Sequence, residues 1–375
     1  MPPISVMIKP ASGLCNLRCK YCFYADEMNH REVQSYGMMT EQTMEQIVQK
    51  CIDFADGSSC HFGFQGGEPT LRGLDFFRQF VATATAYNDK QKRPAALGYA
   101  LQTNGTVLDE DWAIFFAENQ FLVGLSLDGD RSAHDLHRVD DHQKGTYSTV
   151  LKAAKLLETH KVDFNVLTVI TAYTAKHIGQ IYKFFMKNNL FYQQYIPCLD
   201  PLEEPHGLHP YSLTPALYGQ FLIRLFDCWY ADRMAGNFVY IRYFENLAAA
   251  MLGQHTEACG FMGRCSLQTV IEADGSAYPC DFYMLDQYKI GNFNDDTMAE
   301  MNDRRGDSGF LEQSLQGLEK CRQCQYYQLC RGGCRRDRQS QDMAVIGENY
   351  FCPSFKAFFA HAAPKMAHLL RQNNR

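Results

Sequence analysis

Fifteen cysteines among 375 residues are the feature of this sequence with the clearest chemical potential. Three of them, Cys15, Cys19 and Cys22, form a CxxxCxxC run. Thiolates at this spacing can hold three corners of a [4Fe–4S] cluster and leave the fourth iron open to a small molecule. A zinc site without its fourth ligand, or a loop of unrelated cysteines, is the alternative.

A second group of cysteines lies in the C-terminal third of the chain. Nine residues separate Cys265 from Gly275, four more precede Cys280, and a CxxCx5CxxxC run follows. The eight members are Cys259, Cys265, Cys280, Cys321, Cys324, Cys330, Cys334 and Cys352. Eight thiols suffice for two fully ligated [4Fe–4S] clusters, with two structural zinc sites as the alternative. The remaining four, Cys51, Cys60, Cys198 and Cys228, lie in apolar patterns and are expected to pack as small buried hydrophobic residues.

The elements that must position these cysteines alternate between strand and helix patterns. Short runs rich in Val, Ile, Leu, Phe and Tyr predict strands over 5–8, 61–65, 99–103, 122–127, 164–169 and 193–197. Amphipathic spacing predicts helices over 41–55, 76–87, 110–119, 148–159 and 174–188. Six such units predict parallel strands in an open partial barrel with its site at the strand C-terminal ends. The CxxxCxxC run follows the first strand, and Gly66-Gly67-Glu68-Pro69 follows the second.

The rest of the chain has a different texture. A loop is expected over 200–211, a helix over 217–234 and a terminal helix over 354–373. From Cys259 onward the apolar periodicity weakens and short hairpin-like runs occur, so this segment is expected to need metal sites to fold. We therefore predict two domains, 1–235 with the partial barrel and 236–375 with the cysteine-rich segment.

Composition excludes several classes of protein. Hydrophobic residues make up 46% and charged residues 21%, which rules out wholesale disorder. A net charge of -6 argues against a nucleic-acid partner. No apolar run reaches the ~20 residues of a membrane helix. The N-terminus also lacks the pattern of a secretory signal, so we expect a cytoplasmic protein with reduced cysteines.

Together, CxxxCxxC and GGEP resemble the radical S-adenosylmethionine (SAM) superfamily, and the later cysteine pattern resembles its SPASM extension. The stretches PPISVMIKPASGLCNLRCKYCFY, FGFQGGEPTLRGLDFF, LQTNGT and CDFY resemble anaerobic sulfatase-maturating enzymes over essentially the whole chain. The resemblance implies a partial (β/α)6 TIM-like barrel of the radical SAM type with a cysteine-rich C-terminal SPASM domain. It also implies three [4Fe–4S] clusters and SAM as cofactors.

The resemblance assigns ligands residue by residue. Cys15, Cys19 and Cys22 hold the SAM cluster; Cys259, Cys265, Cys280 and Cys334 hold auxiliary cluster I; Cys321, Cys324, Cys330 and Cys352 hold auxiliary cluster II. Expected SAM contacts are Tyr21, Gly66, Gly67, Glu68, Asn104, Ser126, Arg138 and Leu199. Among them, Glu68 is expected to accept from the SAM ammonium, while GGEP and Asn104-Gly105 could alternatively be simple turns.

The activity implied is the oxygen-independent oxidation of a Cys or Ser side chain in a sulfatase to Cα-formylglycine, by hydrogen abstraction from Cβ with a 5′-deoxyadenosyl radical. Asp281 is the implied base, with a turn-capping aspartate as the alternative. Tyr24, Gln65, Arg242 and Tyr243 are expected in the substrate cavity. Expected partners are an unfolded or nascent C/S-x-P-x-R segment of a sulfatase and a low-potential donor such as flavodoxin or ferredoxin. We expect a monomer with no nucleic-acid or membrane partner.

Two competing hypotheses come from the same residues. Another SPASM peptide-modifying enzyme, forming thioether or C–C crosslinks in a ribosomal peptide, would share every cluster ligand. A zinc-stabilised nucleic-acid binder would use Arg331, Arg335, Arg336 and Arg338. Net charge opposes the second hypothesis, and we expect these arginines on a solvated or cluster-adjacent face.

Overall fold

The computed structural model describes residues 3–340 and 343–373. The chain forms two compact units. The first comprises the chain up to Leu127, Arg138–Phe164 and Leu267–Phe310; the second comprises Asp128–His137, Asn165–Ser266 and the chain from Leu311 onward. Each unit is thus built from several segments, whereas the predicted division between residues 235 and 236 cuts the chain once. That division stays a prediction.

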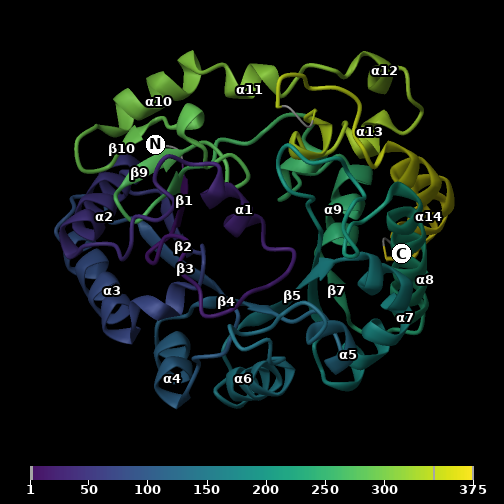
Figure 1. Ribbon diagram of the computed structural model, residues 1–375, viewed down its shortest axis with the longest axis horizontal. Coiled ribbons are helices and arrows are strands. Elements are labelled where there is room, and N and C mark those ends of the chain that lie inside the picture. Colours follow the sequence, from purple (N-terminus) through teal and green to yellow (C-terminus); the bar gives the residue numbers. More distant parts are fainter. Residues whose placement is uncertain (1–2, 341–342, 374–375) are drawn as a thin grey trace. The chain divides into compact units, whose positions relative to one another are not determined.

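Four parallel strands form the centre of the first unit and lie side by side in chain order (Figure 1). They are β1 (Ile4–Ile8), β2 (Ser59–Phe64), β3 (Ala96–Thr103) and β4 (Leu122–Ser126). Ile8 pairs with Phe64, and Phe64 pairs with Leu101. The strand C-terminal ends therefore adjoin, and the loops that follow them share one edge of the sheet, where a parallel barrel places its chemistry.

Three short strands from the C-terminal third extend this sheet beside β1. β8 (Val270–Ile271) runs parallel to β1, and β9 (Ser276–Tyr278) and β10 (Gly291–Asn292) follow antiparallel. Lys9 N donates to Ile271 O at 2.8 Å, which continues the β1–β8 ladder. The hairpin-like runs expected after Cys259 are thus present, and they bring the segment with Cys280 and Asp281 into the same unit as β1.

Helices of the first unit have local sequence reasons for their starts. They are α1 (Phe23–Asn29), α2 (Glu41–Ala55), α3 (Leu74–Asn88), α4 (Glu110–Glu118), α6 (Tyr147–Thr159) and α10 (Met298–Asp307), with 3-10 turns η1 (Pro69–Arg72) and η3 (Asp286–Tyr288). Thr40 and Asp109 cap α2 and α4 by accepting from the backbone N–H three residues later. Figure 1 shows α2, α3 and α4 along the outside of β1–β4.

An aromatic core fixes the strand ends in this unit. Phe64 of β2 meets Phe77 and Phe80 of α3 edge to face, with ring centroids 5.0 and 4.9 Å apart. All three side chains are fully buried. Edge-to-face pairs add to the free energy of burial and restrict ring orientation, so the end of β2 is held rigidly.

The second unit contains three parallel strands and most of the remaining helices. The strands are β5 (Phe164–Ile170, after its first residue), β6 (Tyr192–Pro197) and β7 (Tyr240–Ile241). The helices are α5 (Arg131–His134), α7 (Ala172–Lys187), α8 (Pro215–Met234), α9 (Arg242–Met251), α11 (Phe310–Gln313, after its first residue), α12 (Glu319–Arg322), α13 (Tyr327–Cys330) and α14 (Cys352–Asn373), with turns η2 (Cys259–Phe261) and η4 (Arg336–Arg338). α14 lies against α8, where Ser354 Oγ donates to Pro215 O at 2.6 Å (Figure 1).

The six predicted strands are all present, with ends displaced by at most three residues, and 200–211 is a loop as expected. The helices α1, α9 and α10 were not predicted. α10 buries only Met301 and Arg305, which gives no helical stripe, but its Thr297–Glu300 capping box is a sequence signal for a helix start.

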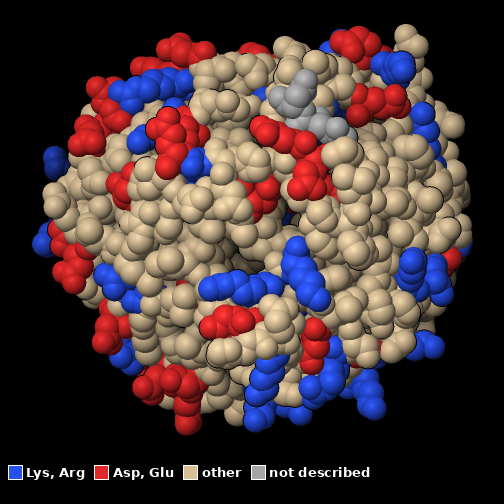
Figure 2. All heavy atoms as spheres, in the orientation of Figure 1, with Lys and Arg blue, Asp and Glu red and all other residues tan. Residues whose placement is uncertain are grey.

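Surface charge and helix composition bear on the excluded partners. Acidic and basic side chains are interspersed over the face drawn in Figure 2. Within 3–340 and 343–373, no helix is both long enough and apolar enough to span a bilayer.

Candidate active site and cysteine clusters

The CxxxCxxC loop lies directly after β1. Leu17 N donates to Cys15 Sγ at 3.3 Å, and Cys22 N donates to Cys19 O at 3.1 Å, so backbone hydrogen bonds shape the loop. Burial raises the pKa of the Cys15 thiol to about 11, and the nearby Glu68 and Cys22 charges raise it further. A thiol in such a place needs a cation to become a thiolate, and a metal supplies that charge.

Gly66 and Gly67 let the loop after β2 press against the cysteine loop. Gly67 N donates to Ser12 O at 2.9 Å and Glu68 N donates to Leu14 O at 2.8 Å. A Cβ at Gly67 would lie 2.1 Å from Leu14 O, and Gly66 has φ +137°. The expected close approach of backbone is present here, and the cysteine loop is one partner of that approach.

Glu68 is buried and ties this loop to the end of β3. Its Oε1 accepts from Thr70 Oγ1 at 2.6 Å and Thr103 Oγ1 at 2.7 Å, and its Oε2 accepts from Asn104 N at 2.7 Å. Burial raises its pKa, while these hydrogen bonds act in the opposite direction. Since a carboxylate oxygen can accept two hydrogen bonds, Oε2 retains capacity for one more donor.

Other predicted SAM contacts gather around the same loop. Asn104 Nδ2 donates to Asn16 Oδ1 at 2.9 Å and lies 3.8 Å from Cys15 Sγ. The Arg138 guanidinium lies 5.6 Å from the centroid of the Tyr21 ring. Ser126 ends β4 and is buried, whereas Leu199 follows β6 in the second unit. Seven of the eight predicted contacts thus belong to the first unit.

Asp281 is the centre of a buried hydrogen-bond cluster. Tyr24 Oη donates to its two carboxylate oxygens at 2.7 Å each, and Gln65 Nε2 donates to Oδ2 at 3.0 Å and to Tyr24 Oη at 2.8 Å. Burial, with the Asp281 charge next, raises the pKa of Tyr24 well above its usual value, so its hydroxyl remains a donor. Tyr24 and Gln65, predicted as substrate residues, are therefore the immediate partners of the predicted base.

The sequence analysis did not single out Lys9, whose Nζ lies 3.0 Å from Asp281 Oδ1. Lys9 directly follows the apolar strand β1 and precedes Pro10. A charged residue at the C-terminal end of a buried barrel strand is a signal that could have identified it.

Arg242 and Tyr243, the other two predicted substrate residues, lie in the second unit. Arg242 pairs with Glu257 at 3.2 Å on an exposed surface. Tyr243 packs with Phe261 and Phe358 at ring-centroid distances of 5.1 and 5.8 Å. These contacts are structural, and a substrate role for either residue stays a prediction.

Four cysteines of the second unit surround one cavity of about 90 Å³, several times the ~30 Å³ that one liquid water molecule occupies. They are Cys321, Cys324, Cys330 and Cys352. In the part of the chain that the structure describes, no three His, Cys, Asp or Glu side chains are grouped to hold a single metal ion. Since zinc would draw four thiolates to within ~4 Å of one another, this spacing fits a polynuclear cluster better than zinc.

A second cysteine group lies in the same unit. Burial raises the pKa of the Cys334 thiol, and the neighbouring Asp337, Cys259 and Cys265 raise it further. Burial and Cys259 likewise raise the pKa of Cys265. Cys259, Cys265 and Cys334 are thus mutual neighbours, whereas Cys280 belongs to the first unit. The assignment of Cys280 to the same cluster stays a prediction.

The arginines of the 331–338 segment correct one expectation. Arg335, Arg336 and Arg338 are buried rather than solvated. Arg336 donates to Asp200 O at 3.3 Å, and Arg338 donates to Gln316 O at 2.8 Å and to Ser314 O. Their donors satisfy backbone carbonyls of a loop-rich segment, so they cannot serve as a phosphate-binding surface.

The four leftover cysteines mostly follow the packing prediction. Cys51, Cys60 and Cys198 are buried, as expected. Cys228 is only partly buried, because α8 leaves that side of its turn half covered. All fifteen cysteines are free thiols.

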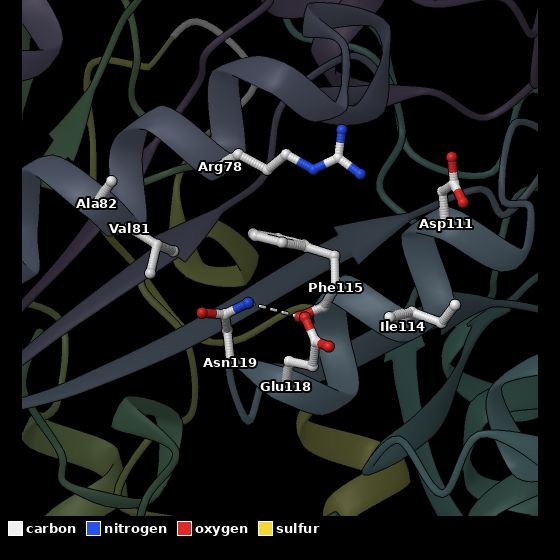
Figure 3. Close-up of a pocket in the computed structure, with 8 residues that line it drawn as sticks. All are labelled: Arg78, Val81, Ala82, Asp111, Ile114, Phe115, Glu118 and Asn119. Carbon is white, nitrogen blue, oxygen red and sulfur yellow. Dashed lines mark hydrogen bonds between the residues drawn. The ribbon is translucent and has the colours of Figure 1, made fainter.

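A separate groove lies between α3 and α4 (Figure 3). Arg78, Asp111 and Glu118 contribute charges, and Asn119 Nδ2 donates to Phe115 O at 2.8 Å. Its lining comes from the outer helices rather than from the strand ends, so it is no part of the cysteine or Asp281 sites.

Comparison with known proteins follows the same division of the chain. Residues 10–185 match the family model described as the radical SAM superfamily, and residues 259–325 match the SPASM model, described as an iron–sulfur cluster-binding domain. The chain is 46% identical to a cysteine-type anaerobic sulfatase-maturating enzyme of Clostridium novyi (strain NT), over 99% of this chain and 98% of that protein. The chain belongs to the anaerobic sulfatase-maturating enzymes.

Two further similarities are informative within the anaerobic sulfatase-maturating enzymes. A serine-type member from Bacteroides thetaiotaomicron is 29% identical over 97% of this chain and 90% of its own length. The solved structure described as native anSMEcpe with bound AdoMet and Kp18Cys peptide matches with a TM-score of 0.93 and 44% identity, over 99% of this chain and all of that one. The predicted radical SAM fold with a SPASM domain is confirmed, and family membership implies SAM and iron–sulfur clusters as cofactors.

Proposed function

We propose that this enzyme oxidises a cysteine side chain of a sulfatase polypeptide to Cα-formylglycine without oxygen. The observation that carries the proposal is the buried Asp281 carboxylate, held by Tyr24 and Gln65 directly after the predicted cluster ligand Cys280. A positioned carboxylate suits a substrate thiol, whose pKa of ~8.5 leaves it mostly protonated near neutrality.

Cys15, Cys19 and Cys22 would hold the SAM cluster, and the surrounding loops would hold SAM. When bound, this pair supplies the 5′-deoxyadenosyl radical that removes a hydrogen atom from the substrate Cβ. Gly66 and Gly67 fix the cysteine loop through the Ser12 and Leu14 carbonyls. Oε2 of Glu68 has room for a SAM ammonium donor, which supports the predicted contact.

After hydrogen removal, completing the oxidation requires loss of a proton and an electron from the substrate. Asp281 would accept the thiol proton, since its carboxylate is placed by side chains from two strand ends and α1. The C-terminal cysteines would hold two auxiliary clusters that accept the electron, giving three [4Fe–4S] clusters in total. The cavity formed by Cys321, Cys324, Cys330 and Cys352 supports one of these two sites.

Cysteine rather than serine is the proposed target residue. Identity is 46% to a cysteine-type relative and 29% to a serine-type one. The proposed partners are a peptide segment of the form C-x-P-x-R and a low-potential donor such as flavodoxin or ferredoxin, with the enzyme acting as a monomer. Fifteen free cysteines support a reducing compartment, and we propose the cytoplasm.

Anaerobic incubation with SAM, a reductant and a C-x-P-x-R peptide tests the proposal by mass spectrometry. Formylglycine formation lowers the peptide mass by about 18 Da, whereas a thioether or C–C crosslink lowers it by about 2 Da. Replacement of Asp281 with asparagine should lower peptide oxidation by about 10²-fold or more and leave the iron content unchanged. An unmodified or crosslinked peptide would reject the proposed reaction.

A further inference from the structure

Lys9 is a buried cation at the end of β1, beside the carboxylate that the proposed reaction uses. Its side chain is 1% exposed, and its Nζ lies 3.0 Å from Asp281 Oδ1. The same nitrogen lies 3.5 Å above the centroid of the Tyr24 ring. Among the described residues, no acceptor is aligned with Nζ for a regular hydrogen bond, so the contact with Oδ1 is chiefly an attraction between charges.

The need for this cation follows from the burial of Asp281, which is 7% exposed. An ionised carboxylate away from water carries a large desolvation penalty unless a charge of opposite sign lies close by. Tyr24 and Gln65 are neutral donors and cannot balance that charge. Lys9 does so from the opposite side of Oδ1, while its aliphatic stem stays within the apolar interior.

Lys9 also determines where the carboxylate stands. Asp281 follows β9 in a segment without strand pairing of its own, since the strand ends at Tyr278. Lys9 N donates to Ile271 O at 2.8 Å, so its backbone is fixed on the β1–β8 ladder. Two contacts to Oδ1, from Tyr24 and Lys9, and two to Oδ2, from Tyr24 and Gln65, match the roughly four acceptor directions of a carboxylate.

We propose that Lys9 is a positioning residue that acts through Asp281. It balances the carboxylate charge and holds Oδ1 in place so that the carboxylate meets the substrate thiol. The inference rests on the proposed function, because Asp281 has a catalytic task only if the substrate loses a proton.

Lys9→Met and Lys9→Arg test this inference in the full-length enzyme with its clusters. Misplacement of a reacting group by ~1 Å reduces rates by about 10²-fold. Lys9→Met should therefore lower kcat for peptide oxidation by about that factor, with iron per chain and the Kd of a fluorescent C-x-P-x-R peptide unchanged. Lys9→Arg, which keeps the charge, should restore kcat to within about tenfold of wild type. A kcat for Lys9→Met within about threefold of wild type would overturn the proposal.

Lys50→Met is the matched control. Lys50 Nζ donates to Phe293 O at 2.5 Å and Asp296 O at 2.8 Å, so it also links the barrel side of the first unit to its C-terminal segment without contacting Asp281. Its kcat should equal that of wild type. If loss of Lys50 reduced kcat as much as loss of Lys9, a general effect on packing would replace the positioning role.

A double variant separates action through Asp281 from other effects, including misfolding caused by an unbalanced charge. Lys9→Met combined with Asp281→Asn removes both charges, and its kcat should match that of Asp281→Asn alone. A further fall of tenfold or more would overturn the proposal. Failure of the proposed function is recognised independently, because the wild-type enzyme would then yield no product about 18 Da lighter than the cysteine peptide.

Discussion

Replacement of Gly67 with alanine tests whether the glycine pair after β2 holds the cysteine loop in place. The new Cβ would lie 2.1 Å from Leu14 O, about 0.9 Å inside the 3.0 Å limit that real Cβ contacts observe. Both the obstructing atoms and Gly67 belong to backbone, so the loop itself must move. Such overpacking costs ~1–3 kcal/mol, and loss of the Glu68 N to Leu14 O hydrogen bond adds ~1 kcal/mol.

The movement should affect one cluster selectively. Leu14 directly precedes Cys15, so a shift of ~1 Å in its carbonyl displaces the first ligand of the SAM cluster. We expect Gly67→Ala to bind about eight irons per chain after anaerobic reconstitution, against about twelve for wild type. SAM cleavage should fall by about 10²-fold or more, while the auxiliary-cluster absorbance remains.

Gly63→Ala provides the control within β2. Its added Cβ would have Val6 O at 3.5 Å as its nearest neighbour, an ordinary contact, so iron content and SAM cleavage should match wild type. If Gly67→Ala also retained about twelve irons and cleaved SAM at the wild-type rate, the role assigned to Gly67 would be refuted.

Three further predictions concern stability and iron content. The pair Arg31–Glu272 is buried at 2.8 Å, so Arg31→Met should destabilise the protein by ~3–5 kcal/mol in denaturant unfolding, and the double variant with Glu272→Gln should be the more stable of the two. Its hydrogen bond with Arg304 lowers the pKa of Asp296 to about 2, so the stabilisation is complete above the unfolded pKa of ~3.9 and lost as pH falls through about 2. Asp296→Asn should thus melt below wild type at pH 7, and the two melting temperatures should converge in acid. Cys324→Ser should remove about four irons per chain, and unchanged iron would contradict the cluster assigned to its cavity.

The sequence predicted the repeating part of the fold well because that part has strong local signals. Strands β1 to β6 are short apolar runs bounded by turn residues, and their ends were located to within three residues. α2 was predicted with its observed bounds, since Thr40 caps it and one face is fully apolar. These features depend on a few neighbouring residues, which a sequence displays directly.

The C-terminal segment was harder because its structure depends on distant partners. β8 and β9 are two and three residues long and exist by pairing with β1 and with each other. The burial of Arg338 reflects carbonyls of Gln316 and Ser314, which no periodic pattern announces. Long-range pairing of short segments leaves little local signal.

The candidate site shows the same contrast. The cysteine spacing and GGEP identified the loops after β1 and β2, since both are local motifs. The partnership of Lys9, Tyr24 and Gln65 with Asp281 joins residues at least 216 positions apart from Asp281, and only the folded chain brings them together. Family resemblance suggested Tyr24, Gln65 and Asp281, but not how they contact one another, and it did not indicate Lys9.

The central claim is that this enzyme removes a hydrogen atom from Cβ of a cysteine in a sulfatase segment. The most direct measurement uses a C-x-P-x-R peptide whose cysteine carries two deuterium atoms on Cβ, incubated anaerobically with SAM and reductant. We predict that one deuterium, a gain of about 1 Da, is found in 5′-deoxyadenosine and that the other remains on the formylglycine aldehyde. Formylglycine formed together with 5′-deoxyadenosine that contains no deuterium would contradict the account.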